Sequence, residues 1–226
     1  MGGQYVGDTW EWDGMGWTKS TRSGPGARNS PATVYDEKRR RILLFGGEAR
    51  PVGVLGDTWE LAGDHWARFA TDGPAPRGIY AMAYDVARGR TMLLGGTAAP
   101  RPEAPSFSDT WEWDGQRWSR IDAVGPSARD HTQMVYDPTR RVIALHGRGL
   151  DQQATETWTY DGRAWTRAGF KGPSRRYAKT VFDGRGRSVL LYGGFARQPS
   201  NERWRLGESG WELVAPQASR DRKSVV

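Results

Sequence analysis

Short apolar segments recur along the chain, separated by stretches rich in glycine, proline and charge. In each recurrence a β-prone run ends in an aromatic residue and aspartate, and an apolar run follows after a polar turn. The aromatic residues are Tyr35, Tyr84, Tyr136 and Phe182, and the apolar runs are 42–45, 92–94, 143–146 and 189–192. In every copy ten positions separate the aromatic residue from the end of the apolar run. This constant spacing predicts two paired strands joined by a turn of fixed length.

A second pair of strands follows in each copy. Segments such as 57–61 and 109–113 alternate large apolar residues with polar ones, which is typical of a half-buried strand. A turn containing glycine then leads to a tryptophan seven residues after an earlier one. The five pairs are Trp10/Trp17, Trp59/Trp66, Trp111/Trp118, Trp158/Trp165 and Trp204/Trp211, with first members 49, 52, 47 and 46 residues apart. A period of about 50 residues built from strands predicts a repeat architecture.

The repeat has four full copies and one half copy. The full copies lie at about 22–69, 73–121, 125–168 and 172–214, and residues 1–18 hold only a glycine pair and the last two strands. We therefore expect one domain over 1–214 and a disordered polar tail over 215–226. Three interpretations of the half copy stay open: the chain is a piece of a longer protein, the domain is small or open, or another copy of the chain completes it. The unpaired edge of its first strand favours self-association.

These units resemble the bacterial-type kelch motif. The resemblance rests on paired glycines after an apolar strand, and on the pattern Asp-Thr-Trp-x-aromatic-Asp-Gly with a second tryptophan, as at 109–118. It covers nearly all of residues 1–214. It implies an all-β fold, a β-propeller in which each repeat forms one four-stranded blade. With four full repeats and an N-terminal half blade, the propeller would be partial or open. The resemblance also implies that tryptophans pack between blades and that the glycines admit close backbone approach.

Composition limits the classes of function. The 226 residues include no cysteine, which excludes disulfides, thiolate nucleophiles and cysteine-ligated metals. No apolar run is long enough to span a membrane. No signal peptide is recognisable, so the compartment stays open, cytoplasmic or, if an upstream segment is missing, secreted. The net charge of +7 favours acidic partners. Basic residues are nevertheless spread around the repeats, and those in the turn between the first two strands lie near aspartates, so we expect local neutralisation and not nucleic-acid binding.

Arginines gather on the face that carries the longer loops. Strands alternate in direction, so the loops between the second and third strands share a face with the connections between repeats. The candidate ligand-binding residues there are Arg28, Arg77, Arg129 and Arg176 before the first strands, Arg50, Arg101, Arg148 and Arg197 in loops, and Asp130 with His131. Guanidinium groups bind carboxylates and sulfates through paired hydrogen bonds. The arginines before the first strands have an alternative, structural interpretation, because a residue that recurs in every repeat can satisfy carbonyls or pair with an acid.

The pattern favours a non-enzymatic kelch-like binding or scaffold module. It would engage an acidic protein or an anionic glycan through the arginine-rich face, without a cofactor or a metal ion. The alternative is a carbohydrate-active enzyme similar to sialate mutarotases, with Arg28, Arg77, Arg129, Asp130 and His131 converging in the central channel. A site similar to that of galactose oxidases is excluded because its cofactor requires a cysteine. His131 and His146 belong to one repeat, but two histidines are too few to predict a metal site.

Overall fold

The protein is built entirely from strands, turns and loops in the part that the structure describes. The computed structural model describes residues 4–99, 101, 103–127, 131–149, 155–195 and 198–214. They form four four-stranded antiparallel sheets and one two-stranded sheet. The described part of the chain contains no long apolar helix of the kind that crosses a membrane. The predicted tail, 215–226, lies outside the described residues.

Each sheet is a simple antiparallel meander of consecutive strands. The hairpin sheet consists of β1 (Trp10–Trp12) and β2 (Trp17–Lys19). The first sheet consists of β3 (Ala32–Asp36), β4 (Arg41–Ala49), β5 (Gly53–Ala62) and β6 (His65–Phe69). The second consists of β7 (Ala81–Asp85), β8 (Arg90–Leu94), β9 (Thr110–Trp113) and β10 (Trp118–Ile121). The third consists of β11 (Gln133–Asp137), β12 (Val142–Arg148), β13 (Thr155–Tyr160) and β14 (Trp165–Arg167). The fourth consists of β15 (Lys179–Asp183), β16 (Ser188–Tyr192), β17 (Arg203–Leu206) and β18 (Trp211–Val214).

The predicted strands and their register are confirmed. The aromatic residue near the end of each first strand pairs with the equivalent residue of the second strand in all four sheets. These pairs are Tyr35↔Ile42, Tyr84↔Thr91, Tyr136↔Ile143 and Phe182↔Val189. The constant spacing in the sequence therefore reflects one hairpin geometry used four times.

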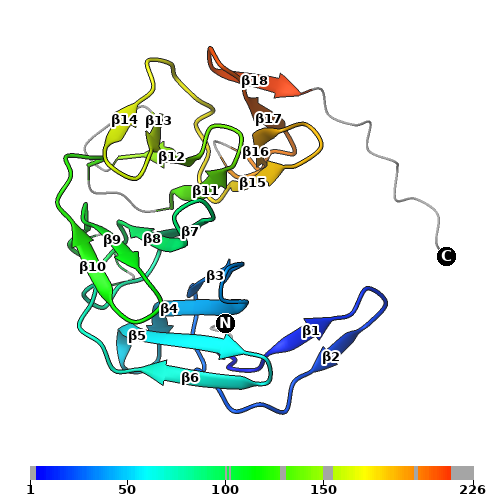
Figure 1. Cartoon of the computed structure of the whole chain (residues 1–226), viewed down its shortest axis with the longest axis vertical. Coiled ribbons are helices and arrows are strands. Elements are labelled where there is room, and N and C mark those ends of the chain that lie inside the picture. The colour runs from blue at the N-terminus through cyan, green and yellow to red at the C-terminus, as the bar shows by residue number, and fades with distance from the viewer. Residues whose placement is uncertain are drawn as a thin grey trace.

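The sheets are arranged in a ring, as Figure 1 shows. Their first strands, β3, β7, β11 and β15, lie innermost, and each contacts the next. Their last strands, β6, β10, β14 and β18, lie at the periphery. The ring is open between the fourth sheet and the hairpin sheet (Figure 1), so the arrangement is propeller-like and incomplete.

The core lies between successive sheets. Leu43 and Phe45 of the first sheet pack against Leu93 and Trp113 of the second. The second and third sheets bury a larger cluster that includes Met92, and the third and fourth bury Ala144 and Val189. The second and third sheets thus share both faces with their neighbours, which explains why their middle strands are apolar on both sides.

In the second, third and fourth sheets, the second tryptophan of the pair donates a hydrogen bond to the preceding sheet, as expected for tryptophans that pack between sheets. The hydrogen bonds are Trp118 Nε1 to Thr58 Oγ1 at 2.9 Å, Trp165 Nε1 to Thr110 Oγ1 at 3.3 Å and Trp211 Nε1 to Thr157 Oγ1 at 2.8 Å. Trp66 is the exception. Its indole nitrogen is buried without a hydrogen-bond partner in the described part of the chain.

The paired glycines admit close backbone approach, as expected. Gly47 has a φ of +95°, and a Cβ atom there would lie 2.9 Å from the carbonyl oxygen of Asn29. Gly194 has a φ of +84°, and its Cβ would lie 2.7 Å from the carbonyl oxygen of Arg176. Any other residue would be strained at these positions, because the left-handed conformation and the short distance both exclude a side chain.

Candidate functional site

Arg28 and Arg77 bind acids of their own sheet. Arg28 donates from Nη1 and Nη2 to the two carboxylate oxygens of Asp57, at 2.8 and 3.0 Å, and Nη1 also reaches the carbonyl of Gly46. Arg77 makes the same paired contact with Asp109, at 2.6 and 3.0 Å. The Arg77 side chain is fully buried. The structural interpretation of these two arginines is therefore correct, because their guanidinium groups are already occupied inside the protein.

Each of these acids also accepts a hydrogen bond from a tryptophan. Trp59 Nε1 donates to Asp57 at 2.6 Å, and Trp111 Nε1 donates to Asp109 at 2.7 Å. Burial opposes ionisation of Asp57, but the hydrogen bonds from Arg28 and Trp59 outweigh it and lower the pKa of its carboxyl group. Trp59 and Trp111 thus each complete a trio of arginine, acid and indole, here called a clasp.

In the fourth sheet the clasp uses Arg175, although the sequence alignment points to Arg176. Backbone bridges pair Asn29 with Glu48, Gly78 with Thr97 and Arg176 with Phe195, so Arg176 is equivalent to the residue after the clasp arginine. Arg175 pairs with Glu202, which also accepts from the indole of Trp204 at 3.0 Å. The segment between proline and arginine is one residue shorter here than in the other copies. The sequence alone does not reveal which of two adjacent arginines takes the position.

Two loop-face arginines from the predicted set lie together. Arg148 and Arg176 are exposed and line one hollow of about 720 Å³ with Arg175, Tyr177 and Phe195. No carboxylate is among the described residues that line it. On the described part of the arginine-rich face, these arginines thus form a cluster between the third and fourth sheets.

A second cavity, of about 730 Å³, lies at the centre of the ring and is lined by the first strands and the residues before them. Its rim carries four equivalent residues in the left-handed conformation: Ser30, Ile79, His131 and Tyr177, with φ of 49°, 58°, 50° and 58°. Such a conformation costs free energy in any residue other than glycine, most of all in β-branched Ile79. The described lining contains no carboxylate, and Lys179 supplies a positive charge.

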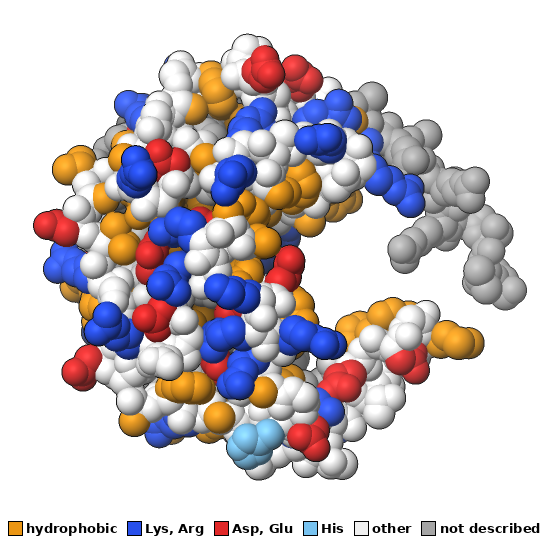
Figure 2. All heavy atoms as spheres, in the orientation of Figure 1, with side chains coloured by type: hydrophobic (Ala, Val, Ile, Leu, Met, Phe, Trp, Pro, Cys, Tyr) orange, Lys and Arg blue, Asp and Glu red, His pale blue; other side chains and the backbone are white. Residues whose placement is uncertain are grey.

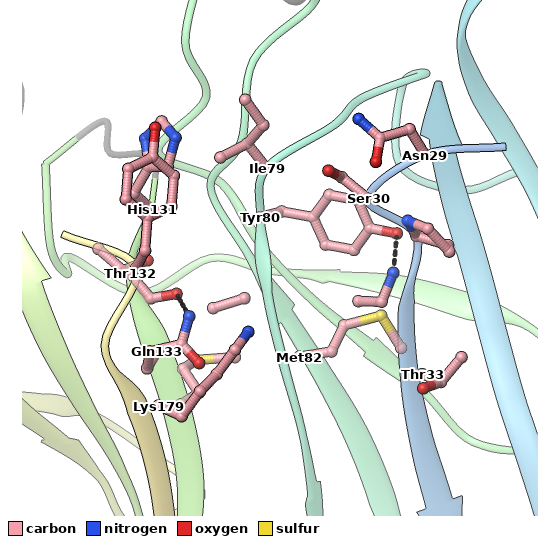
Figure 3. A pocket seen from close by; sticks show the side chains of 15 residues that line it. Asn29, Ser30, Thr33, Ile79, Tyr80, Met82, His131, Thr132, Gln133 and Lys179 are labelled. Carbon is pink, nitrogen blue, oxygen red and sulfur yellow. Dashed lines mark hydrogen bonds between the residues drawn. The ribbon is translucent and has the colours of Figure 1, made fainter. Parts of the chain in front are cut away.

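Tyr177 joins the two cavities because it lines both. Its ring meets that of His131 edge to face, with 4.5 Å between the centroids, and 61% of its side chain is exposed. Figure 3 shows His131 at the rim, with Gln133 and Lys179 deeper along the same wall and Tyr80 across the cavity. His131 is among the candidate residues predicted from the sequence, whereas Tyr177 and Lys179 are not. Tyr177 is equivalent to His131, and this equivalence could have pointed to Tyr177. It is not recognisable in the sequence, because the segment after Pro173 is one residue shorter in the fourth copy.

The other predicted residues lie elsewhere. Arg50 is exposed and stacks over the ring of Tyr5, 5.0 Å from its centroid. Arg101 is exposed, and neither it nor Arg50 lines the two cavities. Arg129, Asp130 and Arg197 lie outside the described residues.

The turns between first and second strands, on the opposite face, neutralise their arginines locally, as predicted. The bonds are Arg39 to Asp36, Arg88 to Asp85 and Arg140 to Asp137, each at 2.7 Å. Arg39 also reaches the buried Glu60 at 2.5 Å and the carbonyl of Gly115 in the next sheet. Arg39 therefore also links the first sheet to the second.

The two histidines of the third repeat do not form a pair. His146 is buried, and its ring nitrogens lie 3.0 Å from Thr157 Oγ1 and 2.9 Å from the carbonyl oxygen of Pro173. Burial lowers the pKa of His146 to about 4, against the opposing effect of the Pro173 contact. The described residues contain no group of three or more histidines and acids that could hold a metal ion.

No family model matches this chain, and no curated protein matches it.

Proposed function

We propose that the protein is a kelch-like β-propeller, partial or open, that acts as a non-enzymatic binding module for an acidic glycan. The observation that carries this proposal is the cluster of Arg148, Arg176 and Tyr177 in one hollow without a described carboxylate. Paired guanidinium groups bind carboxylate or sulfate, and an exposed tyrosine ring packs against the apolar face of a sugar. An acidic protein is the other partner class that such a surface suits.

The dimensions and the position of the cluster favour a glycan over a protein surface. Tyr177 stands where the hollow meets the central cavity, so a chain of sugars bound at the arginines would continue past His131 towards Lys179. Ligand sites in proteins are typically hollows of 300–1,000 Å³, about the size of each of these two. A concave site of this kind suits a chain of sugars better than a broad protein surface.

A mutarotase-like enzyme is less well supported. That alternative requires Arg28 and Arg77 to converge on a substrate, but both already bind acids of their own sheets. Freeing Arg77 would leave Asp109 without its partner in a partly buried position, at a cost of about 3 kcal/mol.

The proposal is tested by calorimetric titration with sialylated, uronic-acid and sulfated oligosaccharides, with neutral oligosaccharides as the reference. We expect at least one acidic class to bind and the neutral sugars not to bind. The double substitution Arg148→Ala and Arg176→Ala should weaken binding at least tenfold, because charge-assisted hydrogen bonds contribute about 1.5–3 kcal/mol each.

The matched control is Arg101→Ala, which removes an exposed arginine of the same face outside both cavities. It should leave the affinity unchanged. Equal losses in Arg101→Ala would indicate a diffuse charge effect and contradict the proposed site. Binding of an acidic peptide together with no binding of any acidic sugar would replace the glycan with a protein partner.

A further inference from the structure

The turns between the first and second strands carry an excess of positive charge. The four turns span residues 36–41, 85–90, 137–141 and 183–187, and they hold ten lysines and arginines against five acids. Figure 2 shows lysine and arginine side chains along the inner part of the ring. This charge lies on the face opposite to the hollow that contains Arg148 and Arg176.

Ion pairs within the turns neutralise only part of this charge. Arg39 binds Asp36 of its own turn, and Arg88 and Arg140 bind their aspartates in the same way. Glu37 is exposed, and Asp183 accepts a hydrogen bond from the backbone nitrogen of Arg185 at 3.0 Å. The exposed cations of these turns that have no acid within ion-pair distance among the described residues are Lys38, Arg40, Arg141, Arg185 and Arg187.

Three of these arginines have a backbone conformation that favours glycine. Arg40, Arg141 and Arg187 lie four residues after the aspartate that ends each first strand, and their φ angles are 55°, 57° and 48°. The equivalent residue of the second sheet is Gly89, with a φ of 64°. Any residue other than glycine adopts this conformation at a free-energy cost. No ion pair in the described part of the chain offsets that cost for the three arginines.

A cation also covers the one equivalent position that holds glycine. A Cβ atom at Gly89 would lie 3.1 Å from Cδ of Lys38 and 3.6 Å from its Nζ. The ammonium group of the first turn therefore lies beside the second turn. Each of the four turns thus has a positive charge at the same point, supplied by Arg40, Lys38, Arg141 and Arg187.

The four turns end at one level of the ring. The strands β3, β7, β11 and β15 each have five residues, end at an aspartate and pair with the second strand in the same register. These strands also contact one another in order around the ring. Equivalent turns therefore lie near one plane across the axis of the ring, and a flat partner contacts all four together.

We infer that this face, here called the turn face, docks on an anionic phospholipid bilayer. Guanidinium groups bind phosphate through paired hydrogen bonds, and a bilayer presents its phosphates in a plane. A cluster of about four to eight lysines and arginines is typical of surfaces that bind anionic lipids. Val86, which is 43% exposed in the second turn, adds an apolar side chain among the cations.

Nucleic acid suits the turn face less well. Base edges are read by a helix or a two-stranded ribbon in a groove, and single strands stack on exposed aromatic side chains. The four turns contain no aromatic residue. A duplex is also a cylinder, so its phosphates would reach only part of a planar ring of cations.

The experiment measures sedimentation of the full chain with vesicles of phosphatidylcholine and phosphatidylglycerol in equal parts. Vesicles of phosphatidylcholine alone are the reference. We expect binding to the anionic vesicles only, and weaker binding as salt is added, because salt screens the charges. Amide hydrogen exchange of the bound protein should slow at residues 37–41, 86–90, 138–141 and 184–187, and it should stay unchanged in the loop of residues 103–108 on the opposite face.

The triple substitution Arg40→Gly, Arg141→Gly and Arg187→Gly removes three charges without straining the fold. Glycine suits the left-handed conformation at all three positions, so the melting temperature should not fall. Affinity for the anionic vesicles should fall about a hundredfold, which is the effect expected for three cations at a lipid surface.

The matched control is the triple substitution Arg68→Gln, Arg101→Gln and Arg120→Gln. It removes the same charge from exposed positions outside the four turns, and it should leave the affinity unchanged. Equal losses in the two triple variants would indicate a diffuse charge effect and overturn the inference. Failure of the unmodified protein to bind anionic vesicles at low salt would also overturn it. Tighter binding to a DNA duplex of mixed sequence than to the vesicles would assign the turn face to nucleic acid instead.

Discussion

Arg77 shows how one buried side chain holds three segments of a sheet together. It binds both oxygens of Asp109 and the carbonyl of Gly95, and its guanidinium carbon lies 4.0 Å from the centre of the Phe107 ring. The strand, the glycine pair and the acid before the third strand are thus fixed by one planar group. Lysine would not replace it, because an ammonium group cannot form the paired contact with the carboxylate.

Removing the clasp arginines should reduce stability according to their burial. Arg77→Ala leaves Asp109 unpaired in a partly buried position and should lower the free energy of unfolding by about 3 kcal/mol. Arg175→Ala should lower it by less, because Glu202 is more exposed. The neighbouring Arg176→Ala should have no measurable effect. Urea unfolding checks the series, and equal effects of Arg175→Ala and Arg176→Ala would contradict the assignment of the fourth clasp.

The sequence predicted that an arginine recurs before each first strand, and it offered the structural role as one of two interpretations. It did not identify Arg175, because the segment after Pro173 is one residue shorter and the next residue, Arg176, then stands at the spacing that the clasp arginine has in the other copies. Only the backbone bridge between Arg176 and Phe195 fixes the alignment. For the same reason Tyr177 was not recognised as equivalent to His131.

The interfaces between sheets follow one scheme with local variations. At the interface between the third and fourth sheets, the indole of Trp211 donates to the hydroxyl group of Thr157. His146 lies within hydrogen-bond distance of the same hydroxyl group. A neutral imidazole that donates from Nε2 to the Pro173 carbonyl leaves Nδ1 to accept from Thr157. Protonation of Nδ1 would remove that acceptor, so the interface requires the neutral ring.

The stability of this interface should depend on pH. Burial lowers the folded-state pKa of His146 to about 4, whereas an exposed histidine has a pKa near 6.5. The unfolded chain therefore binds the additional proton first, and the free energy of unfolding should fall as the pH drops from about 6.5 to about 4, by about 3 kcal/mol in total. His146→Leu, which introduces the residue found at the equivalent Leu94, should remove this contribution. Urea unfolding at several pH values checks it, and an unchanged pH slope in the variant would contradict it.

The strand hairpins are the part of the structure that the sequence predicts best. A fixed spacing and strict alternation specify which residues pair and which face the core, and both signals are local. The contacts between sheets are not local, so the sequence could suggest that tryptophans pack there but could not name Thr58 or Thr110 as their partners.

We expect the sheets at the two ends of the ring to unfold locally more readily than the sheets between them. The second sheet is covered on both sides, and all of β7 and most of β8 are buried. The hairpin sheet has exposed side chains throughout both strands. In an array where each unit contacts only its neighbours, stability is roughly a sum of units and interfaces, so the terminal units open first.

Hydrogen exchange followed by mass spectrometry should therefore show a gradient along the chain. We expect amides of β7 and β8 to exchange slowest and those of β1 and β2 to exchange fastest in the absence of any partner. Exchange at β1 as slow as at β7 would mean that the hairpin sheet is already paired.

The four rim residues in the left-handed conformation share one backbone geometry but carry chemically different side chains. The backbone takes the same turn at Ser30, Ile79, His131 and Tyr177, yet a hydroxyl, an aliphatic group, an imidazole and a phenol occupy it. Glycine would adopt this conformation at a lower free-energy cost at each position. The surrounding sheets therefore supply the stability that holds the four residues in it. The rim therefore consists of four positions with equivalent backbone conformation at which the side chain differs. All four positions lie outside the strands, so their side chains should be replaceable one at a time without altering a strand.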